Sequence, residues 1–146
     1  MRILGLDMGS NTIGIAVSDE LGITAQGLKT IIRKSMGEDL KEISTIIERF
    51  QIGKIVVGLP RNMDGTMGTQ AEKVLRWVET VKRKLCIPIE TWDERLSTVE
   101  ASRVLIEADL SRRKRKKVID KLAAVIILQG YLNQDRKQND ELPFPA

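Results

Sequence analysis

Histidine is missing from this chain of 146 residues. Without imidazole groups there can be no histidine-ligated zinc site and no Ser-His-Asp triad. The metal-free ribonuclease chemistry in which imidazoles act as acid and base is excluded too. Any hydrolysis must therefore depend on carboxylates, and we expect those carboxylates to work with a bound metal ion.

Cysteine, aromatic residues and long apolar runs are also scarce. The single cysteine, Cys86, excludes a disulfide framework within the chain, and its apolar surroundings predict a buried structural thiol. Aromatic residues make up 3% of the chain, so we expect Trp77 and Trp92 in the core, not stacked on bases. No apolar run approaches the ~20 residues of a membrane span, and no basic-then-apolar leader opens the chain. These features predict a cytoplasmic protein without a membrane partner.

The composition that remains is that of a globular protein, with 42% apolar and 30% charged residues. The length suits one domain, which we place at residues 1–135, and the polar residues 136–146 predict a flexible tail. The net charge is only +4, yet six consecutive residues are basic: Arg112, Arg113, Lys114, Arg115, Lys116 and Lys117. A run of this kind indicates a polyanionic partner such as nucleic acid, although a solvated loop is the alternative.

The apolar pattern alternates between extended and helical segments. Strands are predicted at residues 2–7, 12–18, 25–32, 54–58 and 87–92, the last two without clean alternation, as in strands covered on both faces. Capping boxes predict helices that start at Ser35, Thr69 and Ser97, the third over residues 98–108. A last helix is expected at residues 117–132. This order predicts a three-layer α/β fold, with a mixed five-stranded sheet and helices on both faces.

Acidic residues follow two of the predicted strands and open the last helix. Asp7 ends the first strand, Asp93 and Glu94 end the fifth, and Asp120 lies near the start of the final helix. Ligands in open α/β sheets bind at the carboxyl ends of the strands. Three or four converging carboxylates can hold Mg²⁺ or Mn²⁺ ions that activate water against a phosphodiester. Because neighbours on a strand point to opposite sides, only one of Asp93 and Glu94 is expected to face such a site.

Each acid also has a purely structural interpretation. Asp7 could cap the turn that follows it, and Asp93 or Glu94 could form a surface ion pair with Arg95. Asp120 could complement the dipole of its helix. The residue pattern alone leaves both interpretations open.

The segment 58–65 joins the fourth strand to the second helix. It offers backbone amides, an amide side chain (Asn62), a base and an acid at the carboxyl end of a strand, which suits substrate binding. A simple turn built from Pro60 and the pair Asp64-Gly65 is the alternative.

Four motifs follow one another along the chain: Leu6-Asp7-x-Gly9 with Ile13-Gly14-Ile15-Ala16-Val17-Ser18-Asp19, then Val56-Val57-Gly58-Leu59-Pro60-x-Asn62-Met63-Asp64-Gly65, then Asp93-Glu94-Arg95-Leu96-Ser97-Thr98, and Asp120-x-x-Ala123-Ala124-x-Ile126-Ile127-Leu128. Together they resemble the YqgF family of pre-16S ribosomal RNA nucleases and Holliday-junction-resolvase-like proteins. The resemblance implies a ribonuclease H-like fold, divalent-metal catalysis with Mg²⁺ or Mn²⁺, and trimming of the 5′ end of a ribosomal RNA precursor in the cytoplasm.

The resemblance also assigns roles to residues. Asp7, Glu94 and Asp120 match the catalytic acids of the family, with Asp93 as a further metal ligand in reserve. The chain departs from the family at Ser10-Asn11-Thr12, where many members carry a basic residue.

The resulting hypothesis is a metal-dependent nuclease that acts on structured RNA, on its own or within ribosomal precursor particles. Asn62, Arg95 and the basic run Arg112–Lys117 are its expected substrate-binding residues. One alternative is a DNA-junction resolvase, which would need a dimer to cut two strands, so both monomer and dimer remain open. Another is an RNA-binding ribosome assembly factor without catalysis. A third, suggested by the stretch Asp7-Met8-Gly9-Ser10-Asn11-Thr12, is a nucleotide- or polyphosphate-binding domain like those of sugar kinases, although the chain has room for one such domain and not two.

Overall fold

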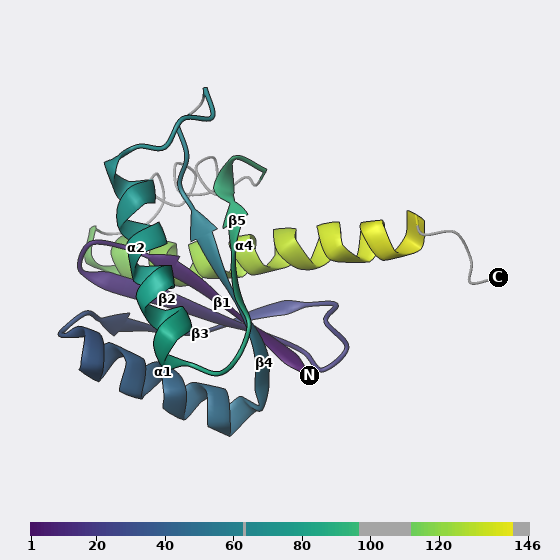
Figure 1. Cartoon of the computed structure of the whole chain (residues 1–146), viewed down its shortest axis with the longest axis horizontal. Helices are drawn as coiled ribbons and strands as arrows, with labels where there is room; N and C mark the ends of the chain where they lie inside the picture. The colour runs from purple at the N-terminus through teal and green to yellow at the C-terminus, as the bar shows by residue number, and fades with distance from the viewer. Residues whose placement is uncertain (63, 97–111, 142–146) are drawn as a thin grey trace.

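The protein is seen in a computed structural model that describes residues 1–62, 64–96 and 112–141 (Figure 1). Its centre is a five-stranded sheet in the order β3-β2-β1-β4-β5. The first three strands, β1 (Arg2–Met8), β2 (Thr12–Ser18) and β3 (Ala25–Ile32), pair antiparallel. The last two, β4 (Ile52–Leu59) and β5 (Ile89–Asp93), are added parallel to β1.

Helices cover both faces of this sheet. Helices α1 (Met36–Phe50) and α2 (Thr69–Lys84) lie on one face, and α4 (Arg112–Glu141) crosses the other face (Figure 1). A short 3₁₀ turn, η1 (Glu94–Leu96), follows β5. The three-layer α/β fold with a mixed five-stranded sheet, predicted from the order of apolar segments, is confirmed. No helix in the described part of the chain is long and apolar enough to cross a membrane.

Strand β1 divides its side chains between the two layers. Leu4, Leu6 and Met8 belong to the core between the sheet and helices α1 and α2, whereas Ile3 packs against α4. Because successive side chains on a strand point to opposite faces, Asp7 shares the α4 face with Ile3 and not with its neighbours.

Helix α4 packs closely on the sheet because small residues lie where the two meet. A Cβ added to Gly5 would lie 2.7 Å from Cβ of Leu128, and Ala16 and Ala124 are both fully buried. The helix begins at Arg112 and continues to Glu141, so it is longer than the predicted span of 117–132. Lys, Arg and Gln are good helix formers, and no proline occurs between residue 112 and Pro143. The expected tail at residues 136–146 therefore begins inside a helix.

The helix starts were predicted with mixed success. Ser35 caps α1 as expected, since its side chain accepts the Glu38 backbone N–H at 3.2 Å. The capping box at Thr69 is wrong, because Gly68 is the capping residue of α2 and makes no side-chain cap. The helix thus starts one residue earlier than predicted, at a glycine where an added Cβ would lie 3.2 Å from Oδ1 of Asn62. The helix predicted after Ser97 lies outside the described residues.

One further expectation fails just before β5. Cys86 is exposed, not buried, because Leu85 and Ile87 on either side of it turn toward the core. β5 lies at the edge of the sheet, yet it is covered on both faces as expected, because Ile89 packs in the core with α1 and α2 and Trp92 packs against α4, while Glu90 is exposed. β4 is also buried on both sides, and Trp77 and Trp92 lie in the core as predicted.

Candidate functional site

Asp7 is the central polar group of the α4 face. The residue is 8% exposed and lies near the carboxyl end of the middle strand. The parallel register pairs Leu6 of β1 with Val57 of β4, so the next pair along the ladder brings Asp7 level with Gly58. Neighbouring strands lie about 4.8 Å apart, and Gly58 is therefore the part of β4 nearest to Asp7.

Glu94 reaches the same place from the far side of β4. It is the first residue of η1, directly after β5. A Cβ added to Gly58 would lie 2.7 Å from Oε1 of Glu94 and 2.5 Å from Cδ1 of Ile127, which belongs to α4. The Glu94 carboxylate thus lies over Gly58 on the α4 face. Only glycine leaves room for both neighbours at this position.

Asp93 is turned away and is held by Arg95. Its carboxylate accepts the Arg95 backbone N–H at 2.9 Å and pairs with the guanidinium group, with 2.7 Å from Nη2 to Oδ2. These hydrogen bonds lower the pKa of the Asp93 carboxyl, the Arg95 side chain contributing most. Of the two neighbouring acids, Glu94 lies by Gly58 while Asp93 forms the local ion pair that was considered as the structural alternative.

Asp120 lies on α4, one turn before Ala124. Near Gly27 of β3 the helix carries Lys121, while near Ala25 it carries Gln129, whose side chain accepts the Ala25 N–H at 2.9 Å. The helix therefore runs opposite to β3, and also opposite to β1, which is parallel to β3.

This direction sets the level of Asp120 along the sheet. Ala124 lies over Gly5, with its carbonyl oxygen 3.4 Å from where a Cβ of Gly5 would be. One turn earlier, position 120 shares the face of Ala124 and lies toward the level of Asp7. The side chain of Asp120 is outside the described part. Among the side chains that are described, no three His, Cys, Asp or Glu residues form a group that could hold a metal ion.

Asn62 takes part in the turn between β4 and α2. Its Nδ2 donates to Oγ1 of Thr66 at 3.0 Å, and its backbone N–H donates to the carbonyl of the same residue. Asp64 closes the turn, because its carboxylate accepts hydrogen bonds from the Thr66 backbone N–H and from the Thr66 hydroxyl. These bonds lower the pKa of the Asp64 carboxyl, and the bond from the hydroxyl contributes most. The structure thus supports the turn interpretation of this segment, and binding of substrate by Asn62 remains a prediction.

Arg95 connects the two segments that flank Glu94. Besides pairing with Asp93, its guanidinium group packs against Gly65, where an added Cβ would lie 3.1 Å from Nη1. Gly65 has a φ of 89°, which favours glycine. The basic run Arg112–Lys117 forms the beginning of α4, and its side chains are outside the described part.

Sequence reasoning missed two residues near these acids. Gly58 is part of one motif, but it was not recognised from the sequence that the absence of a Cβ there lets the Glu94 side chain lie against the strand. A glycine inside the buried run Val56-Val57-Gly58 is the signal, since glycine in a strand often marks a close approach. Arg33 was also missed, although its Nη1 donates to the carbonyl of Gly9 at 2.7 Å, two residues after Asp7.

Comparison with known proteins gives the following matches. A family model described as "RuvX: Holliday junction resolvase" matches residues 1–134. A curated protein of Clostridium acetobutylicum, named "Putative pre-16S rRNA nuclease", is 58% identical over 91% of this chain and 98% of its own length. A protein of the same name from Desulforamulus reducens is 57% identical over 94% of this chain and 100% of its own.

Solved structures of lower identity share the architecture. RuvC from T. thermophilus in complex with a Holliday junction substrate gives a TM-score of 0.56 at 15% identity, covering 92% of this chain and 96% of that one. The yeast mitochondrial Holliday junction resolvase Ydc2 gives 0.54 at 11% identity, covering 95% and 80%. This likeness confirms the predicted ribonuclease H-like fold.

Proposed function

Because the chain belongs to the RuvX family, whose model is described as Holliday junction resolvase, we propose that it is a metal-dependent nuclease that trims the 5′ end of pre-16S ribosomal RNA. The observation that carries this proposal is the arrangement around Gly58. Two carboxylates from separate elements, Asp7 and Glu94, lie beside it on one face of the sheet. Asp120 precedes by one turn Ala124 of α4, whose carbonyl oxygen lies near Gly5 on the same face, and this position supports its inclusion.

These residues fit a divalent cation by the chemistry of their donors. Carboxylate oxygens are the hard ligands that Mg²⁺ and Mn²⁺ prefer, and the chain has no histidine to favour zinc. We assign Asp7, Glu94 and Asp120 as the ligands, with Asp93 in reserve because Arg95 already occupies it. When bound, the cation would polarise the phosphodiester and make water a better nucleophile at neutral pH.

The protein's own groups shape the site around that chemistry. The sheet fixes Asp7 in a buried position, where charge interactions are weakly screened. Because Gly58 has no Cβ, the Glu94 carboxylate can lie directly over the strand. Arg95 ties Asp93 to the 60–68 turn and thereby fixes the backbone on both sides of Glu94.

The substrate is assigned as structured RNA, free or within ribosomal precursor particles in the cytoplasm. The basic run Arg112–Lys117 lies about two turns or less before Asp120 on the same helix, which supports a role for both in binding one substrate. Basic residues there would bind the sugar-phosphate backbone and release counterions. Asn62 and Arg95 are proposed to bind the same strand at the rim.

A Holliday-junction resolvase is the second candidate, because that is how the matching family is described. Symmetric cleavage of a junction would require two copies of the chain in one complex. The third candidate, an RNA-binding assembly factor without catalysis, would retain the basic run and lack cleavage.

The test is cleavage of a 5′-extended 16S precursor RNA and of a four-way DNA junction, side by side with Mg²⁺, Mn²⁺ or EDTA. We expect metal-dependent cutting of the RNA that is abolished in Asp7→Asn and kept in Glu48→Gln, which removes an exposed charge on α1. Cutting of the junction alone would select the resolvase. Binding of RNA without cutting, in every metal, would select the assembly factor.

A further inference from the structure

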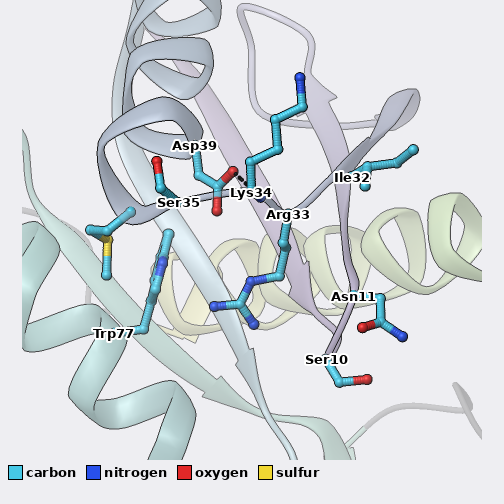
Figure 2. Close-up of a pocket in the computed structure, with 9 residues that line it drawn as sticks. Ser10, Asn11, Ile32, Arg33, Lys34, Ser35, Asp39 and Trp77 are labelled. Carbon is cyan, nitrogen blue, oxygen red and sulfur yellow. Dashed lines mark hydrogen bonds between the residues drawn. The ribbon is translucent and has the colours of Figure 1, made fainter.

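Two adjoining cavities lie beside the β1–β2 turn, on the side of α1 and α2. Their volumes are about 610 and 230 Å³, and Ser10, Arg33 and Trp77 line both of them. We call the pair the Arg33 hollow. Figure 2 shows the larger cavity, with the Arg33 side chain extending between the turn, the start of α1 and the indole of Trp77 on α2. Neither Asp7 nor Glu94 lines it, so it is separate from the carboxylate site.

The central charge of the hollow is the guanidinium group of Arg33. Its Nη1 donates to the carbonyl of Gly9 at 2.7 Å, which fixes the group in place with one of its five N–H donors. A planar guanidinium fixed in this way suits bidentate binding of a phosphate. Lys73 adds a cation on the wall of the smaller cavity, whereas the ammonium end of Lys34 extends away from Arg33 in Figure 2. The one carboxylate of the lining, Asp39, already accepts the Lys34 backbone N–H at 3.0 Å.

Trp77 supplies an observation that is independent of charge. The residue is 5% exposed, and its Nε1 is a buried donor for which the described residues provide no acceptor. Buried donors are almost always paired, so an unpaired one needs an explanation. An oxygen atom of a ligand in the hollow would supply the missing acceptor after a small movement of the ring.

The start of α1 forms another part of the wall. Ser35 and Met36 line the larger cavity, and the helix that they open is 15 residues long. The positive end of a helix dipole attracts anions, so backbone, guanidinium and indole all favour the same kind of ligand.

From these observations we propose that the Arg33 hollow is a subsite for a phosphate group of the nucleic-acid substrate. The proposal rests on the proposed function, because it takes the ligand from that substrate. Gly9, which Arg33 holds, lies two residues after Asp7, so the carboxylate site and the hollow lie on two sides of one turn. A strand bound at the carboxylates would pass over this turn and place a phosphate beside Arg33. The phosphate can be an internal one of the backbone or a terminal one.

The primary test is the salt dependence of RNA binding, measured by fluorescence anisotropy in EDTA so that no metal-dependent cleavage occurs. The probe is a hairpin RNA with a single-stranded 5′ extension. For Arg33→Gln we expect affinity about tenfold lower at low salt. The slope of log K against log salt should fall by about 0.7 if the variant neutralises one phosphate fewer on the single strand. Arg49→Gln is the matched control, since it removes the same charge at the far end of α1 and should leave both values unchanged.

Two further variants protect the test against a folding defect, because Arg33 also holds Gly9. Arg33→Lys keeps the charge, so it should retain the slope while the affinity falls in part. Trp77→Phe keeps most of the ring and removes the N–H, and we expect affinity about threefold lower with an unchanged slope. Thermal unfolding of each variant verifies that it is folded at the temperature of the assay.

RNAs with a 5′-phosphate and with a 5′-hydroxyl distinguish the two sources of the ligand. An equal loss of affinity in Arg33→Gln for both RNAs identifies an internal phosphate, and a loss confined to the phosphorylated RNA identifies a terminal one. Equal affinity and slope in Arg33→Gln and wild type would overturn the subsite, as would an equal loss in Arg49→Gln. If wild-type protein cleaves no substrate but binds RNA through Arg33, the nuclease proposal fails and the subsite stands.

Discussion

The two sides of the β1–β2 turn carry opposite charges. On the α4 side, Asp7 and Glu94 place carboxylates around Gly58, and on the side of α1 and α2, Arg33 places a guanidinium group against the carbonyl of Gly9. The alternation of β1 produces this separation, because Asp7 points to one layer and its neighbour Met8 to the other. In our account, one turn thus separates the groups that hold a cation from a group that holds phosphate. Four sets of variants test this difference between the two sides of the turn.

The largest effect should separate the neighbours Glu94 and Asp93. Glu94→Gln removes a charge that lies over Gly58 and should reduce the rate of RNA cleavage by about 100-fold or more, as loss of a preorganised charged group does. Asp93→Asn alters a carboxylate that Arg95 occupies and should cost much less activity. Single-turnover cleavage rates compare the two variants. If Asp93→Asn slowed cleavage more than Glu94→Gln, Asp93 and not Glu94 would be the metal ligand.

Gly58→Ala should also impair the carboxylate side. The new Cβ would meet Ile127 and the Glu94 carboxylate, so we expect a loss of about 1–3 kcal/mol in the free energy of unfolding, together with slower cleavage. Gly37→Ala is the control, because a Cβ there meets nothing within 4 Å and should be neutral or stabilising by up to about 1 kcal/mol. Urea unfolding measures both. Full stability and activity in Gly58→Ala would show that the site does not require a residue without a Cβ at this position.

A moderate effect is expected from the basic run at the start of α4. Replacing Arg113, Arg115 and Lys117 by Gln should weaken RNA binding and reduce the salt slope by about 0.7 for each single-strand phosphate that is no longer neutralised. The same replacement of Lys82, Arg83 and Lys84 at the end of α2 removes equal charge at another place and should change the slope less. Equal salt slopes in the two triple variants would show that the basic run affects RNA binding only through the net charge of the protein.

The smallest effect concerns acid stability. Arg95 holds the pKa of the Asp93 carboxyl below its usual range, so the pair stabilises the folded state above about pH 4. This contribution disappears as the pH falls through the lowered pKa. Asp93→Asn has no such contribution to lose, and its unfolding free energy should fall slightly less than that of wild type between neutral and acid pH. An identical fall in both proteins would show that the ion pair adds nothing.

The elements were predictable where apolar residues alternate or repeat without interruption. The strands Thr12–Ser18 and Ala25–Ile32 have the predicted bounds, because β-branched residues and flanking turn residues mark them in the sequence. The start of α2 was not predictable, since Thr69 and Glu72 fit a capping box, whereas the residue that caps the helix, Gly68, has no side chain with which to make one. Cys86 was misjudged because the apolar stretch around it alternates at a surface and does not run through the core.

The candidate site was predictable in its chemistry but not in its orientation. The absence of histidine and the acids at strand ends are properties of the sequence, and Asp7 lies at a strand end as expected. Which of Asp93 and Glu94 turns inward depends on the turn after β5 and on the partner Arg95, which no periodicity encodes. The Arg33 hollow arises from three segments that are distant in sequence, so no local pattern marks it.

Whether Asp7 and Glu94 hold a cation together is tested most directly by Mn²⁺ binding, followed by electron paramagnetic resonance without any substrate. If Asp7 and Glu94 share a cation beside Gly58, Asp7→Asn and Glu94→Gln should each weaken Mn²⁺ binding by about tenfold or more, while Asp93→Asn leaves it nearly unchanged. Mn²⁺ bound with wild-type affinity by both Asp7→Asn and Glu94→Gln would show that these two carboxylates do not hold the ion.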